Sequence, residues 1–350
     1  MSDDVAWLAG LSPWPEDGFG LDRMNELLAA LDDPQVAYPA IHVVGTNGKS
    51  TATVTIEQLL LGDGLGVGAT LSPHVRAWEE RIRIGGRCAD LPAALRRVRA
   101  AAESVRATQF ESITAAALTA FADAGVDVAV VEAGLGGRHD ATNVLRSRVV
   151  LLTSVGLEHT DVLGETVEQI ATEKLAVVHT DDTVVILPDE ALASLVPRGR
   201  IELGGAREAA EAFVGHPLGA HVDVVLPGRL ERRPGEIRDG AHNPDGVAWL
   251  QGHVPSADYT ICASVLEDKD VDEMLRRLSS LGGRFVATAS TSPRSLTAAA
   301  LAARARRHFA IVEAVADPTT AVRRAHALGE PVLVTGSLYL LADLEAAENR

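Results

Sequence analysis

Basic charge, cysteine and long apolar runs are all scarce in this sequence. Its 32 lysines and arginines are outnumbered by 48 aspartates and glutamates, which gives a formal net charge of −16. That balance argues against a nucleic-acid partner, which calls for a basic surface, although a small nucleotide site can still be locally basic. Two cysteines, Cys88 and Cys262, form no disulfide framework and favour a reducing cytoplasm. We find no secretory signal and no apolar stretch of membrane-spanning length, and therefore expect no membrane partner.

The length and the apolar pattern indicate two α/β domains. A chain of 350 residues exceeds the ~250–300 residues at which single cores stop growing. Apolar strands alternate with helices up to about Leu187, which predicts a mostly parallel sheet covered on both faces. The alternation resumes after Pro227 and predicts a second, smaller α/β domain. We expect the domains to span residues 1–226 and 227–350, and the interval 188–226 shows only weak periodicity.

Three predicted elements set the positions of polar residues. A buried strand is expected over residues 126–131 and ends at Glu132. A second strand is expected over residues 149–155, shortly before His159. The periodicity after it predicts one helix over residues 163–178.

Residues 45–50 have the composition of a phosphate-binding loop. They follow an apolar strand that begins near Ile41, and precede a helix that we expect over residues 51–61. Two glycines let the main chain approach phosphate oxygens, the lysine adds a mobile charge, and the hydroxyl after the lysine suits a Mg²⁺ ion. The long form of the motif needs a glycine where Val43 stands, so an ordinary strand-to-helix turn is the alternative. We favour phosphate binding because the motif lies where the strand and helix signals meet.

Polar residues at the ends of several predicted strands indicate one metal site. The carboxyl ends of parallel strands meet at one edge of a sheet, where ligands bind. Here those ends carry the phosphate loop with Ser50, and the side chains of Ser72, Glu132 and His159. A carboxylate, an imidazole and a hydroxyl beside bound phosphate suit Mg²⁺. The alternatives are that Glu132 faces water or pairs with Arg138, and that His159 is an ordinary hydrogen-bonded histidine.

The residues alone do not decide the role of two other polar groups. Lys174 follows Glu173 on a largely apolar helix, and a solvated lysine is the usual outcome for that residue type. In the run from Asp239 to Pro244, the aspartate can accept hydrogen bonds from ribose hydroxyls and His242 can stack or donate. An Asx turn before a helix explains the same run equally well.

With these motifs in order, the sequence resembles the folylpolyglutamate synthase/dihydrofolate synthase family of the Mur ligase superfamily. The resemblance covers nearly the whole chain and rests on residues 20–24, 45–50, 72–74, 80–83, 110–111, 132–143, 157–160, 173–174, 227–229, 239–244, 268–270 and 335–337. A muramyl ligase shares the phosphate loop and the Ala-His-Asn-Pro core. It is not expected to carry the Ser-Pro-His and Glu-Ala-Gly-Leu-Gly-Gly-Arg segments in this form.

The resemblance implies an ATP-dependent amide ligase. The carboxylate of a pterin substrate, dihydropteroate or tetrahydrofolate, attacks the γ-phosphoryl group of ATP, and the amino group of L-glutamate then displaces phosphate from the acyl phosphate. The implied architecture is a P-loop-type ATP- and pterin-binding domain over residues 1–226 and a Mur ligase C-terminal type domain over residues 227–350, with domain closure completing the site. We expect a monomer whose partners are the small-molecule substrates.

Matching positions give individual residues an implied role. ATP binding falls to Thr46, Asn47, Gly48, Lys49, Ser50, Arg229, Asp239 and His242. The ligands of Mg²⁺ are Ser50, Ser72, Glu132 and His159. The catalytic residues are Lys49, Lys174 and His159, and Lys174 matches a lysine that is carbamylated in the family and helps to place a second Mg²⁺. The pterin is held by Asp17, Gly18, Phe19, Thr108, Gln109, Phe110, Glu111, His139, Asp140 and Ala141.

Two features depart from the family pattern. Only 53 positions (227 minus 174) separate Lys174 from Pro227, fewer than the family has, and the missing piece includes an Asn-Ala-Ala helix start whose asparagine touches the nucleotide. Residues 206–210 stand in its place without an asparagine, and Arg238 replaces an apolar residue before Asp239. Two alternatives therefore stay beside a folate-type ligase: a ligase for a different carboxylate, and a degenerate Mur-ligase-like nucleotide-binding protein.

Overall fold

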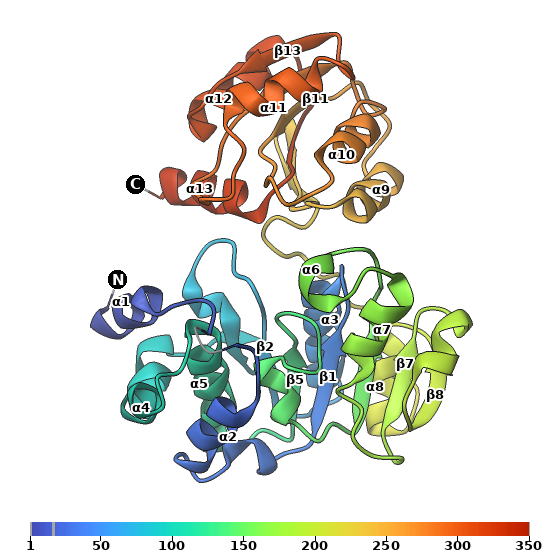
Figure 1. Ribbon diagram of the computed structural model, residues 1–350. Coiled ribbons are helices and arrows are strands. Elements are labelled where there is room, and N and C mark those ends of the chain that lie inside the picture. The colour runs from blue at the N-terminus through green and yellow to red at the C-terminus, as the bar shows by residue number, and fades with distance from the viewer. Residues whose placement is uncertain (1, 16–17, 350) are drawn as a thin grey trace. The chain divides into compact units, whose positions relative to one another are not determined.

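Two sheets, one in each of two units, form the framework of the chain (Figure 1). The structure is a computed structural model that describes residues 2–15 and 18–349. The units are Met1–Val224 and Val225–Arg350, and each has its own hydrophobic core. Both sheets are mostly parallel, which confirms the α/β class expected from the sequence.

The sheet of the first unit is built around β1 (Ala40–Val44), all of whose residues are buried. It lies between β5 (Val128–Glu132) and β6 (Val149–Leu152) and runs parallel to both. The strand order is β4-β3-β2-β5-β1-β6-β7-β8, and the other strands are β2 (Val67–Thr70), β3 (Ile82–Ile84), β4 (Arg87–Cys88), β7 (Val184–Leu187) and β8 (Arg200–Leu203). The central strands are covered on both faces, which explains their nearly continuous apolar sequences.

Helices cover both faces of this sheet. One face carries α3 (Lys49–Gly62) and α8 (Ala206–Val214), which share an apolar cluster with Ile41 and Val43 of β1. The other face carries α5 (Gln109–Ala124), packed on Val131, and the end of α7 (Val167–Leu175), packed near Val44. The remaining helices are α1 (Asp3–Gly10), α2 (Asp22–Ala29), α4 (Leu91–Ser104) and α6 (Thr160–Leu163), with short 3₁₀ turns η1 (Pro34–Val36), η2 (Trp78–Arg81), η3 (Ala141–Val144) and η4 (Glu190–Leu195).

Three sequence expectations for the first unit need adjustment. The strand predicted over residues 149–155 ends with β6, because the chain after it turns to bond the loop that follows β1. The helix predicted over residues 163–178 is present but shorter, as α7, since Gly164 at φ +117° ends α6 before it and the Thr166 side chain caps α7. The weakly periodic interval 188–226 contains η4, β8 and α8, elements too short to give a clear period.

The second unit has a six-stranded sheet in the order β13-β12-β11-β14-β10-β9. Its strands are β9 (Glu231–Arg233), β10 (Glu236–Arg238), β11 (Thr260–Ala263), β12 (Arg284–Ala287), β13 (Ile311–Ala314) and β14 (Val332–Thr335). Its helices are α9 (Pro244–His253), α10 (Val271–Leu278), α11 (Ala298–Ala305), α12 (Pro318–Leu328) and α13 (Leu338–Glu348). The hairpin β9–β10 is antiparallel and the other strand pairs of the described sheet are parallel.

A buried ion-pair network joins this hairpin to α13. The Arg238 side chain is 4% exposed and pairs with Glu236 of its own strand and with Glu345 and Glu348 of α13. Arg233 of β9 pairs with the same two carboxylates of α13. An arginine is therefore accommodated in a buried strand because several carboxylates surround it.

We expect Arg238→Met to destabilise the protein by about 3 kcal/mol, because removing one partner of a buried ion pair leaves the others uncompensated. The urea midpoint and slope of unfolding measure the loss. Arg276→Met is the matched control, since that arginine is 60% exposed and pairs with Glu273 along α10. We expect little change in the control, and equal midpoints for the two variants would contradict the role of the network.

Candidate active site

The loop after β1 contains two positions that favour glycine. Gly45 has φ +149°, and a Cβ at this position would lie 2.0 Å from Thr153 Oγ1. Gly48 has φ +85° and is the N-cap of α3. The predicted strand–loop–helix order is therefore present, and the backbone N–H groups of the loop stand at the positive end of a 14-residue helix.

A hydroxyl-rich segment after β6 holds this loop. The Thr46 N–H donates to the Ser154 carbonyl at 2.9 Å, and the Asn47 N–H donates to the Ser154 hydroxyl at 2.9 Å. The Thr153 hydroxyl donates to the Asn47 carbonyl at 2.7 Å, and the Gly156 N–H donates to the Thr46 hydroxyl at 3.1 Å. Sequence reasoning missed these bracing residues, although their place after the strand beside β1 was a usable signal. A loop fixed in this way loses less conformational freedom when a ligand binds.

Three of the four predicted metal ligands meet at the ends of neighbouring strands. Glu132, at the end of β5, is 2% exposed. Its Oε1 accepts from the Ser50 hydroxyl at 3.0 Å and its Oε2 accepts from the Ser72 N–H at 3.0 Å. Adjacent oxygen ligands of an octahedral Mg²⁺ lie about 2.9 Å apart, so the spacing of Ser50 Oγ and Glu132 Oε1 fits that ion. The described residues contain no group of three or more His, Cys, Asp and Glu side chains suited to a metal.

The fourth predicted ligand, His159, lies beyond the end of β6 at the N-cap of α6. Its backbone is left-handed, with φ +50°, and its Nε2 lies 3.8 Å from Glu158 Oε1. Its role at the metal stays a prediction.

Two lysines meet at the phosphate loop. Lys49 Nζ donates to the Gly45 carbonyl at 3.0 Å and to the Thr46 carbonyl at 3.2 Å. Lys174 Nζ, on α7, donates to the same Gly45 carbonyl at 3.0 Å. Burial lowers the pKa of Lys174 to about 8, and the nearby Lys49 charge adds to the decrease. The prediction from the residues alone that Lys174 is solvated is wrong, because its side chain is buried.

A glycine loop after β5 (residues 134–137) packs against the backbone of Lys174. A Cβ at Gly137 would lie 2.5 Å from the Lys174 carbonyl oxygen, so only glycine allows this approach. The Arg138 N–H donates to the Glu173 carbonyl at 3.1 Å, and the Arg138 side chain pairs with the Glu173 carboxylate at 3.0 Å. Arg138 therefore has the α7 carboxylate as a partner, whereas the sequence alternative paired it with Glu132.

The predicted substrate residues at the start of α5 serve as its cap. The Thr108 hydroxyl accepts from the Glu111 N–H, and the Glu111 carboxylate accepts from the Thr108 N–H at 2.7 Å. Gln109 Nε2 donates to the Leu8 carbonyl at 3.3 Å. The Phe110 ring lies so close to Gly134 that a Cβ there would meet it at 2.6 Å. This part of α5 is thus fixed against the glycine loop.

Two aromatic rings stand exposed before α2. Phe19 is 47% exposed and forms an edge-to-face pair with Trp14, with ring centroids 5.8 Å apart. Gly18 takes φ +91°, and Asp17 lies outside the described residues. Trp14 was not among the predicted substrate residues, and its exposure makes it a candidate to contact a flat ring.

The predicted substrate residue Asp140 is 5% exposed between exposed His139 and buried Ala141. Its Oδ2 accepts from the Leu135 N–H at 2.7 Å and its Oδ1 accepts from the Thr142 N–H at 3.0 Å. Burial raises the pKa of Asp140 and these hydrogen bonds oppose the increase. The carboxylate therefore holds the glycine loop and the start of η3 together.

In the second unit, Asp239 follows β10 and accepts from two backbone N–H groups, Leu230 at 2.9 Å and Ala241 at 2.9 Å. Burial raises its pKa, which the hydrogen bond to Leu230 and the Arg229 charge oppose. His242 Nδ1 lies 2.8 Å from the Gly240 carbonyl oxygen. The Asx turn that the sequence left open is present, since Asp239 bonds the backbone two residues on.

Residues 43–198 match the Mur ligase middle domain family. A dihydrofolate synthase/folylpolyglutamate synthase of Mycobacterium tuberculosis is 32% identical over 388 aligned positions, which cover 85% of this chain and 80% of the relative. The chain belongs to the dihydrofolate synthase/folylpolyglutamate synthase family. Its members are ATP-dependent ligases, as the resemblance implied.

Solved structures of the family have the same fold. Escherichia coli FolC in complex with DHPP and ADP has a TM-score of 0.85 at 25% identity, covering 100% of this chain and 98% of that chain. A bifunctional folylpolyglutamate synthase/dihydrofolate synthase with Mn, AMPPNP and L-glutamate bound has a TM-score of 0.86 at 28% identity, covering 100% and 99%. ATP and a divalent metal are the cofactors that these relatives support.

The chain lacks stretches of the M. tuberculosis relative, and its α8 starts without an asparagine. The alignment with the M. tuberculosis relative is 388 positions long, more than the 350 residues of this chain, so the relative carries stretches that are missing here. The N-cap of α8 is Gly205, whose N–H donates to Glu208 of the same helix at 2.7 Å. The helix start is thus capped by its own glutamate and has no asparagine.

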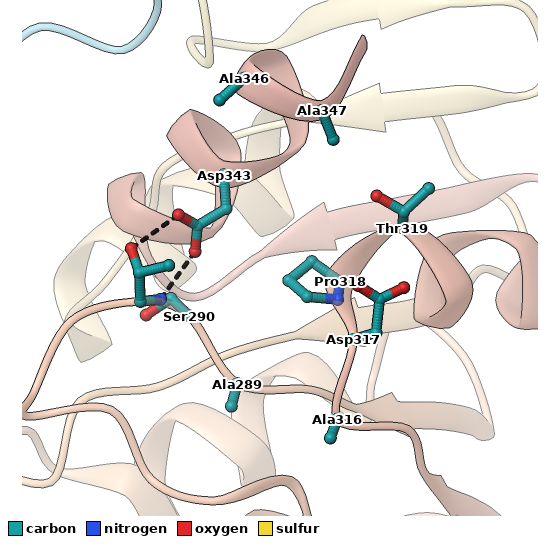
Figure 2. A pocket seen from close by; sticks show the side chains of 10 residues that line it. Ala289, Ser290, Ala316, Asp317, Pro318, Thr319, Asp343, Ala346 and Ala347 are labelled. Atoms are coloured by element: carbon teal, nitrogen blue, oxygen red, sulfur yellow. Dashed lines mark hydrogen bonds between the residues drawn. The ribbon is translucent and has the colours of Figure 1, made fainter. Parts of the chain in front are cut away.

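A cavity of about 540 Å³ in the second unit does not suit the substrates of the family (Figure 2). It lies after β12 and β13, and residues of α13 line one side of it. Its wall carries the carboxylates of Asp317 and Asp343, and none of its lining residues is a lysine or arginine. Thr291 donates its N–H and its hydroxyl to Asp343, each at 2.7 Å. Such an acidic wall would repel phosphates and carboxylates.

No helix in the described part of the chain is long and apolar enough to cross a membrane.

Proposed function

We propose that this protein joins the amino group of L-glutamate to the carboxylate of dihydropteroate, tetrahydrofolate or both, with ATP forming an acyl phosphate. The observation that carries the proposal is the Glu132 carboxylate, 3.0 Å from the Ser50 hydroxyl at the start of α3. It places a metal-ligating pair directly after a phosphate loop, an arrangement that phosphoryl transfer from ATP uses. Relatives with DHPP, AMPPNP and L-glutamate bound support the choice of substrates.

The phosphate loop would hold ATP while its lysine follows the transferring group. The backbone N–H groups of residues 48–50, at the N-terminus of α3, would bind phosphate oxygens, since those of Thr46 and Asn47 already donate to Ser154. Lys49 exchanges its two carbonyl acceptors for the γ-phosphoryl oxygens, where charge develops. A substrate carboxylate oxygen attacks the γ-phosphorus and ADP leaves. The neutral amine of glutamate then attacks the acyl carbon, phosphate leaves with the C–O bond electrons, and the nitrogen gives up one proton to the departing phosphate or to water.

The residues that would hold Mg²⁺ are Ser50, Ser72, Glu132 and His159. The ion supplies Lewis-acid stabilisation of the phosphoryl oxygens. Glu132 provides the negative charge of this set, and the Ser72 N–H fixes the orientation of its carboxylate.

Lys174 is proposed to be carbamylated and to help place a second Mg²⁺. The geometry supports this role, because the amine is buried beside the phosphate loop, 3.0 Å from the Gly45 carbonyl. Carbamylation requires the neutral amine, and with a pKa of about 8, roughly one Lys174 in ten is neutral at pH 7. An ordinary lysine would be neutral in fewer than ~1 in 1,000 molecules.

We expect the carbamate on Lys174 to increase between pH 7 and pH 8.5. The amine nitrogen bonds to the carbon of CO₂ and releases a proton, and raising the pH through about 8 converts the ammonium into the reactive amine. ¹³C NMR in ¹³C-bicarbonate measures the carbamate signal. Lys174→Arg should lack the signal, and a signal of equal size in that variant would refute the assignment.

The remaining residues are proposed to contact the pterin and the nucleotide. Phe19 and Phe110 offer aromatic surface for the pterin, and Asp140 offers a carboxylate. Arg229 and Asp239 are proposed nucleotide contacts, so that residues 1–226 bind ATP and the pterin while residues 227–350 form the second ligase domain. We propose that the protein acts as a monomer in the cytoplasm, in keeping with its two free cysteines.

The test measures phosphate release from ATP with L-glutamate and one of three acids: dihydropteroate, tetrahydrofolate or an unrelated carboxylic acid. Release that needs both glutamate and a pterin acid supports the proposal. Release only with the unrelated acid would assign a different carboxylate. The absence of any acid-dependent release would favour the degenerate nucleotide-binding protein.

A further inference from the structure

We infer that Thr142 and His42 are positioning residues, which fix the Asp140 carboxylate for the pterin substrate through a buried hydrogen-bonded chain. The inference rests on the proposed function, because that function gives Asp140 its contact with the pterin. Neither Thr142 nor His42 touches the substrate in this account.

The hydrogen-bonded chain begins at Asp140, which accepts two hydrogen bonds from Thr142. Asp140 Oδ1 accepts both the N–H of Thr142, at 3.0 Å, and its hydroxyl, at 2.5 Å. Asp140 Oδ2 accepts from the Leu135 N–H at 2.7 Å. With donors on both oxygens, the carboxylate plane cannot rotate without breaking hydrogen bonds to a charged group, each of which contributes about 1.5–3 kcal/mol.

The hydrogen bond between Thr142 and His42 has a fixed donor and acceptor. Thr142 has one hydroxyl proton and donates it to Asp140, so its oxygen must accept from His42 Nε2, which lies 2.8 Å away. His42 Nδ1 has no hydrogen-bond partner among the described residues, so Thr142 is the contact that orients the ring. Burial lowers the pKa of His42 to about 3, which keeps the imidazole neutral. The hydrogen bond to Thr142 then places its single proton on Nε2.

His42 fixes the far end of this hydrogen-bonded chain because it lies in a buried strand. His42 is 0% exposed in the middle of β1, paired with Val131 of β5 and Val150 of β6. Its neighbours Ile41 and Val43 pack against α3 on one face of the sheet. Because side chains alternate along a strand, His42 faces the other side, toward η3. The strand that leads into the phosphate loop therefore also supports the carboxylate of the proposed pterin site.

The experiment compares Thr142→Val, which removes the hydroxyl at nearly constant volume, with Thr142→Ser, which keeps it. Binding of dihydropteroate is measured by calorimetry without ATP, and steady-state phosphate release gives KM and kcat. We expect Thr142→Val to weaken dihydropteroate binding and raise its KM by about tenfold, with the KM for ATP within about twofold of wild type. Thr142→Ser should restore most of the affinity.

Three results would count against the inference, and they separate its failure from that of the proposed function. Wild-type protein that binds no pterin acid would overturn the proposed function, and the inference with it. Wild-type binding that Thr142→Val leaves unchanged would overturn the inference alone. A Thr142→Val variant that loses pterin and ATP affinity equally would also overturn it, since that pattern shows general loosening. His42→Leu, which removes the Nε2 donor, should weaken pterin binding in the same direction as Thr142→Val.

Discussion

Replacing Lys49 by alanine is expected to lower kcat for substrate-dependent phosphate release by about a thousandfold. The ammonium lies at the phosphate loop, 3.0 Å from the Gly45 carbonyl and 3.2 Å from the Thr46 carbonyl. In the proposed reaction it moves onto the γ-phosphoryl group, where negative charge develops in the transition state. Removing one preorganised donor from such a position costs about 10²–10³ in kcat, and loss of a full charge belongs at the upper end of that range.

The control for Lys49→Ala is Arg87→Ala, which removes an exposed basic residue of β4. Phosphate release should stay near the wild-type rate in this variant. Thermal unfolding of both variants separates a catalytic loss from a folding defect. If Lys49→Ala kept more than a tenth of the wild-type rate, phosphoryl transfer at this loop would be refuted.

Replacing Glu132 by glutamine is expected to raise the Mg²⁺ concentration needed for half-maximal activity and to lower kcat by about a hundredfold. Glutamine is nearly isosteric and keeps one acceptor oxygen for the Ser50 hydroxyl. It removes the negative charge that the proposed metal set receives from Glu132. Because Glu132 is 2% exposed, water cannot readily replace the lost carboxylate as a ligand.

A Mg²⁺ titration of phosphate release measures the effect of Glu132→Gln. Glu313→Gln serves as the matched control, since Glu313 lies in the second unit and pairs with Arg324. The control should titrate as wild type does. An unchanged Mg²⁺ requirement in Glu132→Gln would remove that residue from the metal site.

Local sequence rules were sufficient for the central strand, loop and helix. An apolar strand, two glycines and the helical segment that follows them predicted β1, the phosphate loop and α3, because each depends on neighbours in the chain. The position of Glu132 at the end of an apolar strand likewise predicted that its carboxylate would reach the strand ends where Ser50 and Ser72 lie. Their hydrogen bonds at 3.0 Å bear out that meeting.

Local rules failed where a residue's partner is distant in the chain. The bracing of Asn47 by Thr153 and Ser154 joins positions more than a hundred residues apart. The network that accommodates Arg238 depends on α13, at the far end of the sequence. No periodicity or spacing encodes such pairs.

The sequence by itself determined the family, the alternation of strands and helices, and the meeting of Ser50, Ser72 and Glu132 beside the phosphate loop, because motif and hydrophobic period are properties of short segments. Only the tertiary structure decided that Lys174 is buried beside Gly45 rather than solvated. It also decided that Asp140 is supported from β1 through Thr142 and His42. Burial and hydrogen bonding at these positions arise when β1, the glycine loop and α7 pack together, and a residue's type alone does not specify them.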